Sequence, residues 1–454
     1  MTETIAERPF WRLAFDADGD PDRELVAALD AEITGAGITD LVMFSHGWNN
    51  GQEGALDLYR RWFTLLDDHI APARRVGLAG VLWPSQLWRD ESMPDFAAPP
   101  APAESEGGAA GLDAARSVPA GSCALDPRTV AELDALFPSG ADQLAALAGL
   151  LDPAAPAVSA TQLVAHLRGW HEAVASGTDD GELVQAGVPG MFDDDHDPTE
   201  LLEAFAEGLS ETGVDVDSGD GIGGGAAGFG EFATRIRHGA KEALRQLSYW
   251  KMKGRAGVVG RAGVGPVITG LAANHPELRI HLIGHSFGGR VVAFALDGLD
   301  TDGGSPIKSI TILQGAFSRF AFTERLPFAS GGGALAGRLR RLDGPLTVCY
   351  SSFDSALGTM YPLASLAAGD ASSDASDELF RFRAMGSHGA FEPLHKQPLG
   401  GVGATYPFEK QQILNLDAST VVNQGPPPGG AHSDIFKPQL AWVVAAASGL
   451  HRAP

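Results

Sequence analysis

The clearest chemical signal in the sequence is a serine that is flanked by glycines at a spacing of two residues. Residues 284–288 read Gly-His-Ser-Phe-Gly, with Ser286 at the centre. The apolar run 279–283 precedes the motif, and an apolar helical pattern at 290–296 follows it. A strand, a sharp turn and a helix in this order project a serine hydroxyl from the edge of a sheet, so Ser286 is the predicted nucleophile. The supporting residues of this turn are Gly284, His285 and Gly288.

A serine that attacks an acyl group needs two N–H donors where the oxyanion forms. One is the backbone N–H of Phe287, at the start of a helix whose dipole is positive at that end. The other should come from a loop after an earlier strand, where residues 45–50 read Ser-His-Gly-Trp-Asn-Asn. We predict the N–H of Trp48 as the second donor, with Gly47 permitting the turn and His46 bracing the loop.

The partners of the serine should follow it in the order acid, then histidine. Asp354 comes shortly after the apolar strand 345–350 and is the predicted acid. His432 lies between the last strand, 412–416, and the last helix, 438–447, and is the predicted base. Imidazole takes the serine proton near neutral pH, while the carboxylate holds the required tautomer.

Other residues could fill both roles. Asp417, directly after the last strand, is the alternative acid, whereas the aspartates at 370–377 lie in a Gly/Ala/Ser-rich loop that is typical of solvated carboxylates. His388 and His395 are the alternative bases, and both precede the last strand.

The elements that must position these residues alternate along both flanks of the chain. Continuously apolar strands that alternate with helices favour a parallel sheet covered on both faces. We therefore expect an α/β fold with a mostly parallel central sheet and helices on both faces. The expected strands are 40–45, 77–83, 279–284, 309–313, 345–350 and 412–416, and the expected helices are 54–68, 229–253, 267–273, 290–296 and 438–447.

The middle third of the chain differs from its flanks in charge. Of the net charge of −24, residues 90–240 carry −22, from 27 Asp/Glu against 5 Lys/Arg. Helical patterns alternate here with Ala/Pro- and Gly-rich spacers at 96–103 and 221–228. We predict a large acidic, mainly helical insertion that serves as a cap or lid and selects substrate, or else docks a basic protein partner. The predicted domains are the N-terminal half of the core at 1–89, the insertion at 90–240 and the C-terminal half of the core at 241–454.

Together these motifs resemble those of the α/β-hydrolase superfamily, and within it the serine esterases and lipase-like members. The motifs concerned are residues 45–50, 80–85, 284–289, 350–354 and 430–434. The resemblance covers roughly 1–89 and 241–454, and it implies a Ser286–His432–Asp354 triad on a mostly parallel sheet. The stretch 90–240 is far longer than a typical lid helix.

Composition excludes several other classes. Only two cysteines are present, which exclude a disulfide scaffold and a cysteine-rich zinc module. So acidic a chain is a poor nucleic-acid binder. The Asp-rich segment 16–22 has Pro21 where a calcium loop needs glycine, and so indicates an acidic turn. Without a signal-peptide pattern or an apolar stretch approaching the ~18 residues of a membrane span, we expect a cytoplasmic protein that needs no cofactor or metal.

The predicted function is a serine hydrolase that cleaves carboxylic esters, lipid esters included, through an acyl-enzyme intermediate. The same residues would serve an acyltransferase or a thioesterase. A third interpretation is a non-catalytic interaction protein that works through the acidic insertion.

Overall fold

A nine-stranded sheet with the order β1-β2-β4-β3-β5-β6-β7-β9-β8 forms the centre of the computed structural model. Only β1 runs antiparallel to its neighbour, so the expected α/β fold with a mostly parallel sheet is confirmed. The strands are β1 Glu3–Ile5, β2 Arg8–Ala14, β3 Asp40–Ser45, β4 Val76–Leu82, β5 Arg279–His285, β6 Ile307–Leu313, β7 Leu346–Tyr350, β8 His395–Pro398 and β9 Ile413–Asp417. The structure describes residues 3–85, 88, 122–156, 158–174, 197–211, 216, 227–300, 304–360, 380, 383–391, 393–426 and 429–452.

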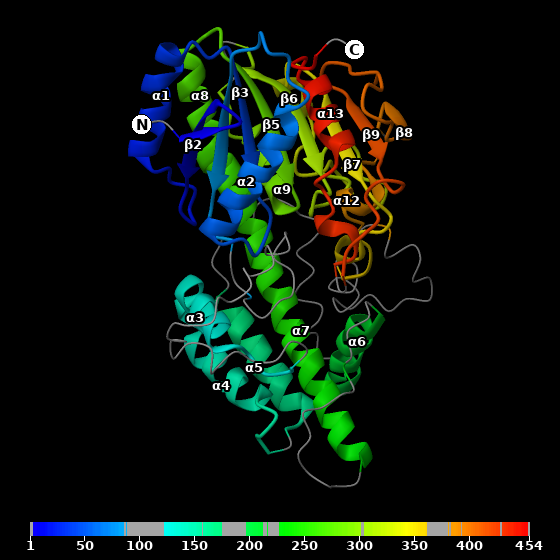
Figure 1. Ribbon diagram of the computed structural model, residues 1–454. Coiled ribbons are helices and arrows are strands. Elements are labelled where there is room, and N and C mark those ends of the chain that lie inside the picture. The colour runs from blue at the N-terminus through cyan, green and yellow to red at the C-terminus, as the bar shows by residue number, and fades with distance from the viewer. Residues whose placement is uncertain are drawn as a thin grey trace, which may run out of the picture.

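Helices cover both faces of the sheet, as expected. Side chains alternate along β3, so that Leu41 and Met43 belong to one apolar core and Val42 and Phe44 to the other. Helices α2 and α13 pack on the second core, in front of the sheet in Figure 1, while α1, α8 and α9 cover the first. The helices of the core are α1 Arg23–Ala36, α2 Gln52–Asp67, α8 Gly265–Asn274, α9 Phe287–Ala295, α12 Met385–His388 and α13 Pro438–Ala447.

Each of the six expected strands is present, with bounds shifted by at most two residues. The expected elements did not include β1, β2, β8, α1 or α12. Strand β8 reads His-Lys-Gln-Pro and lies at the edge of the sheet, so it lacks the apolar run of a central strand.

The middle of the chain folds into helices that lie beyond the carboxyl ends of the strands (Figure 1). They are α3 Pro127–Leu136, α4 Ala141–Leu151, α5 Ala160–Ala173 and α6 Pro198–Glu211, and they pack with the first part of α7 Ala227–Val258. The mainly helical character predicted for the insertion is therefore seen in its described residues. The spacer 96–103 and residues 221–226 of the second spacer lie outside the described residues.

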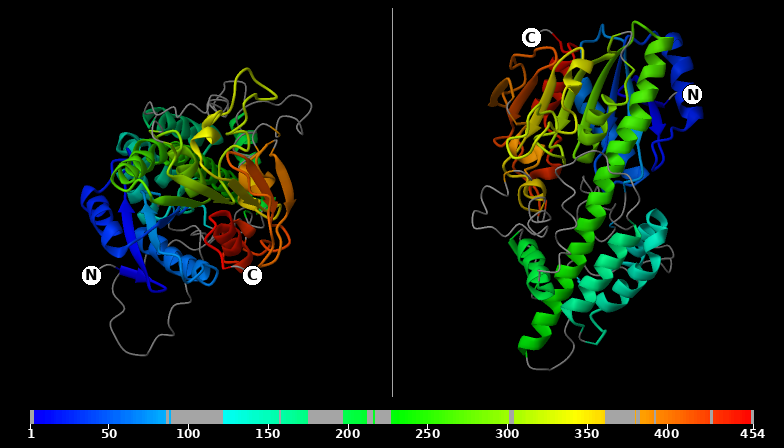
Figure 2. Two further views of the ribbon diagram at one scale, coloured as in Figure 1. Left: turned by 90° about the horizontal axis from the view of Figure 1, so that it is seen from above. Right: turned by 180° about the vertical axis from the view of Figure 1, so that it is seen from behind.

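Helix α7 belongs to both parts of the molecule. It continues through a π-helical turn, Val259–Val264, into α8, so the two helices expected at 229–253 and 267–273 form one helix of 45 residues, Gly230–Asn274. The predicted boundary at residue 240 falls inside α7. Arg290 of α9 donates from Nε to the Lys253 carbonyl of α7 (2.9 Å), which ties the long helix to the core, and Figure 2 shows its full course from behind.

By length and composition alone, helix Gly230–Asn274 could cross a membrane, which corrects the expectation that no apolar stretch approaches the length of a membrane span. More than half of its most apolar 18-residue window, 56 %, is buried inside the protein. This is the behaviour of a core helix, so the feature is weak evidence for a membrane span.

Cations on α7 hold the insertion together through backbone carbonyls. The guanidinium of Arg237 donates to the carbonyls of Leu150 (3.0 Å), Ala155 (3.0 Å) and Pro156 (2.9 Å). The ammonium of Lys241 donates to the carbonyls of two residues at 122–124, at 2.9 Å each. Loops of the acidic insertion are thereby fixed to a basic helix.

A buried polar network lies at the opposite, amino-terminal end of the sheet. His281 on β5 contacts the Ser309 hydroxyl through Nδ1 (2.9 Å) and the Asp40 carboxylate through Nε2 (3.2 Å). Burial lowers the pKa of His281 below its ordinary 6.5, although Asp40 opposes the shift. Burial tends to raise the pKa of Asp40, but hydrogen bonds from His281 and Thr39 and the charge of Arg279 lower it overall.

This network predicts that acid destabilises the fold. The unfolded chain takes up the His281 proton at a higher pH than the folded protein does, so stability falls as the pH drops below about 6.5. We expect the urea midpoint of unfolding to fall between about pH 7.5 and pH 5, and to fall less in His281→Gln. His395→Gln, which removes a surface histidine paired with Glu409, is the control and should keep the wild-type dependence. An equal fall of the urea midpoint with pH in His281→Gln and in wild type would contradict a role of His281 in the acid sensitivity.

Candidate active site

Ser286 sits on a strained turn between β5 and α9. Its backbone angles are φ 56° and ψ −123°, a region that residues other than glycine rarely adopt. Its N–H donates to the Leu313 carbonyl (3.1 Å), and its carbonyl accepts from the N–H of Ala316 (3.0 Å). Neighbouring strand β6 thus fixes the conformation that the sequence motif predicted.

The two glycines of the motif are required by close backbone packing. A Cβ atom at Gly284 would overlap the Gly288 carbonyl, and one at Gly288 would overlap the carbonyl of Ser45. The loop after β3 therefore rests directly on the first turn of α9. This contact brings the predicted second donor segment next to the nucleophile.

The structure brings Ser286, His432 and Asp354 together in one hydrogen-bonded chain. His432 Nε2 lies 2.8 Å from Ser286 Oγ, and His432 Nδ1 lies 2.8 Å from Asp354 Oδ2. Because a carboxylate can only accept, Nδ1 carries the proton and Nε2 is free to accept from the serine hydroxyl. The other carboxylate oxygen accepts from the N–H of Leu357 (3.0 Å). All three side chains of the chain are buried, Asp354 completely.

Two side chains hold the loop that carries His432. His285 donates from Nε2 to the His432 carbonyl (2.9 Å), and Gln314 donates from Nε2 to the carbonyl of Ala431 (2.6 Å). Gln314 directly follows β6, is 2 % exposed and has a positive φ of 45°. Sequence reasoning missed it, although a polar residue at the carboxyl end of a buried strand is a readable signal.

The loop after β3 is braced by polar side chains. His46 is buried, stacks on Trp83 (ring centres 5.5 Å apart) and contacts the carbonyl of Gly47 through Nδ1 at 2.9 Å. Asn49, with a φ of 59°, donates from its side chain to the Trp88 carbonyl and accepts from the Trp88 N–H (2.8 Å). His46 thus occupies a position suited to the predicted bracing role.

An aromatic cluster from three segments covers this region. Tyr249 of α7 packs on Trp48 (ring centres 5.0 Å apart) and on Phe287 (4.6 Å), and the latter two rings are 6.1 Å apart. Phe287 and Tyr249 are buried and Trp48 is partly buried. The side chains of the two residues predicted to supply oxyanion donors therefore contact each other, and the ring of Tyr249 from the long helix α7 packs on both.

The alternative acid and bases lie elsewhere. Asp417 accepts from the hydroxyl of Ser419 (2.6 Å), and His395 lies 3.1 Å from Glu409. His388 contacts the neighbouring Ser387 hydroxyl (2.8 Å). The aspartates at 370–377 lie outside the described residues.

Within the described part of the chain, no group of three or more His, Cys, Asp or Glu side chains could hold a metal ion. The Asp-rich segment forms a turn in which the Asp16 carboxylate accepts from the N–H groups of Asp18 (3.0 Å) and Asp20 (2.9 Å). Burial raises the pKa of Cys349 to about 12, so this thiol is a poor nucleophile or ligand.

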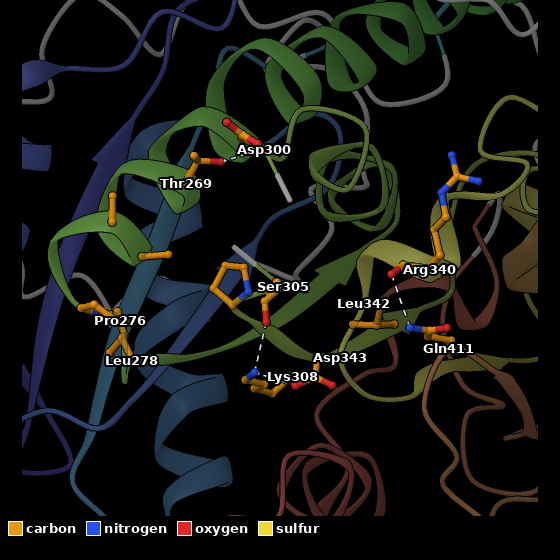
Figure 3. A pocket seen from close by; sticks show the side chains of 14 residues that line it. Thr269, Pro276, Leu278, Asp300, Ser305, Lys308, Arg340, Leu342, Asp343 and Gln411 are labelled. Carbon is orange, nitrogen blue, oxygen red and sulfur yellow. Dashed lines mark hydrogen bonds and ion pairs between the residues drawn. The ribbon is translucent and has the colours of Figure 1, made fainter. Parts of the chain in front are cut away.

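A pocket of about 720 Å³ opens at the other end of the sheet, near the amino ends of β5 and β6 (Figure 3). Its charged wall includes Lys308, which pairs with Asp343 at 2.7 Å, and Arg340, whose carbonyl accepts from Gln411 (3.4 Å). None of the predicted site residues lines it.

Comparison of the chain with family models, with curated proteins and with solved structures gave no match.

The crowded turn predicts that an added methyl group is not tolerated at Gly288. Gly288→Ala would push against the rigid Ser45 carbonyl, so we expect a loss of about 3 kcal/mol or more of unfolding free energy. Gly270→Ala is the matched control, because Gly270 is an exposed helical residue with no atom within 4 Å of the added methyl. This control should gain about 0.5–1 kcal/mol. Chemical denaturation measures both, and a Gly288→Ala protein as stable as wild type would contradict the close contact.

Proposed function

We propose that the protein is a serine hydrolase of the α/β-hydrolase type that cleaves carboxylic esters. The observation that carries the proposal is the hydrogen-bonded chain Asp354–His432–Ser286, with the serine on a strained strand-to-helix turn. The chain order serine, aspartate, histidine on a mostly parallel sheet supports the assignment to this superfamily.

In the first half of the reaction, Ser286 Oγ attacks the acyl carbon while His432 Nε2 takes its proton. The buried Asp354 carboxylate stabilises the imidazolium that forms, without itself becoming protonated. The backbone N–H groups of Phe287 and Trp48 stabilise the oxyanion. His432 then gives its proton to the leaving alcohol, and the acyl group remains on Ser286.

In the second half, His432 Nε2 removes a proton from water, and the water oxygen attacks the acyl carbon. The bond between that carbon and Ser286 Oγ then breaks, His432 returns the proton to Oγ, and the carboxylic acid is released. The aromatic cluster of Trp48, Tyr249 and Phe287 supports an apolar surface near the acyl group. Tyr249 comes from α7, the helix that continues from the insertion into the core, so the insertion is joined directly to this cover, which supports a cap that selects substrate.

We expect Ser286→Ala to lose covalent labelling by a fluorophosphonate and to reduce the turnover of p-nitrophenyl esters by about 10⁴-fold or more. The matched control is Ser309→Ala. Ser309 also contacts a histidine that contacts an aspartate, but it lies inside strand β6 and not at a strand-to-helix turn. It should retain labelling.

Labelling that survives in Ser286→Ala would exclude this serine as the nucleophile. Absence of labelling and of turnover in the wild type would favour the non-catalytic interaction protein. The ratio of acyl transfer to water and to an added alcohol distinguishes a hydrolase from an acyltransferase. Comparing the turnover of thioesters with that of oxygen esters tests the thioesterase alternative.

Gln314→Ala tests how the His432 loop is positioned. Loss of one buried hydrogen bond to the Ala431 carbonyl should lower kcat about tenfold and leave KM nearly unchanged. Gln411→Ala is the control, because Gln411 is an exposed residue at the far end of the sheet. A proportional change of KM with constant kcat would contradict a role in positioning the base.

A further inference from the structure

The segment that follows β6 lies against the turn of the nucleophile and carries an arginine. The N–H of Ala316 donates to the Ser286 carbonyl (3.0 Å), and residues 315–319 then run beside 383–386. The N–H of Arg319 donates to the Arg383 carbonyl (3.1 Å), and its own carbonyl accepts from the N–H of Phe391 (2.9 Å). Three residues span at most about 11 Å, so Arg319 starts close to the active serine.

Arg319 and Arg383 share an aromatic surface. The guanidinium carbon of Arg319 lies 5.8, 5.9 and 5.6 Å from the ring centres of Phe320, Phe380 and Phe391. That of Arg383 lies 5.4 Å from the same Phe380 ring. Ring faces can hold a guanidinium in place while its N–H edge stays available for hydrogen bonds.

No carboxylate among the described residues forms an ion pair with either arginine. The Nε of Arg319 is buried and has no hydrogen-bond acceptor within this part of the chain. Asp417, which like Arg319 lies near the Tyr350 side chain, is engaged with the hydroxyl and the N–H of Ser419. A buried cationic donor without an acceptor is costly, because its water has been removed without replacement.

The charges around Arg319 and Arg383 are also mostly positive. Burial and the neighbouring charge of Arg383 lower the pKa of Arg319. Burial, followed by the charges of Arg383, Arg319 and Lys396, lowers the pKa of His388 to about 4. In a chain with a net charge of −24, this is a local region of positive potential.

We propose that Arg319 and Arg383 form a binding site for the carboxylate or phosphate group of a small-molecule ligand, beside Ser286 at the carboxyl edge of the sheet. A planar guanidinium group can donate two parallel hydrogen bonds to a carboxylate or to a phosphate. If Ser286 is the nucleophile, a premise taken from the proposed function, the natural ester carries an anionic group that these arginines recognise.

Calorimetric titration of the full chain with inorganic phosphate, and separately with glutarate, tests the site at constant ionic strength. We expect both anions to bind wild type, and Arg319→Gln and Arg383→Gln each to weaken binding about tenfold or more. The tighter of the two anions identifies the natural group. Arg325→Gln, which removes an exposed arginine from the same loop, is the control and should bind as wild type does. Absence of binding by wild type, as when the chain's own carboxylates occupy the arginines, or unchanged binding in both variants, would overturn the proposal.

Ester hydrolysis tests the substrate assignment separately. The ratio of kcat/KM for monomethyl glutarate to that for dimethyl glutarate should fall about tenfold in Arg319→Gln and stay constant in Arg325→Gln. If neither ester is hydrolysed while phosphate or glutarate still binds through the arginines, the proposed function fails and the anion site stands. A constant ratio in Arg319→Gln, with anion binding lost, would overturn the substrate assignment.

Discussion

The close backbone contact at the Ser286 turn is the constraint on which the rest of the structure depends. Strand β5, the turn and helix α9 meet so tightly that only glycine fits at positions 284 and 288. The same contact seats the loop after β3, and hence Trp48, against the helix N-terminus. From the turn, His285 reaches the backbone of His432 and Ala316 begins the segment that leads to Arg319. The turn around one strained residue thereby fixes the positions of three separate segments.

Most of the core could be predicted because buried parallel strands are continuously apolar, and each such run proved to be a strand. Edge strand β8 could not be predicted, because its sequence His-Lys-Gln-Pro lacks the apolar run that marks the central strands. The long helix was predicted as two, and glycines at 260, 263 and 265 lie between the two predicted parts. Gly260 instead allows close approach to the Val291 carbonyl of α9, a tertiary demand that no local pattern reveals.

Chain order was enough to select Asp354 and His432 among many acids and histidines, since each loop position follows from the strand before it. The supporting contacts are different in kind. They join segments that lie far apart in the sequence, so they become visible only in the folded structure. Examples are Gln314, Tyr249 and the Arg319–Arg383 pair. The Asp40–His281–Ser309 network shows the converse: the same three residue types meet again, but without a strained turn or a helix N-terminus.

Helix Gly230–Asn274 has a mechanical consequence. At 1.5 Å per residue its 45 residues span about 68 Å, so it is a single rod that is gripped by the insertion at one end and by the core at the other. A displacement of the acidic helices is therefore transmitted along this helix to α9. The connection is the hydrogen bond from Arg290 of α9 to the Lys253 carbonyl, and no flexible linker lies between them. A partner that displaced the insertion would therefore displace α9, the helix that begins directly after Ser286.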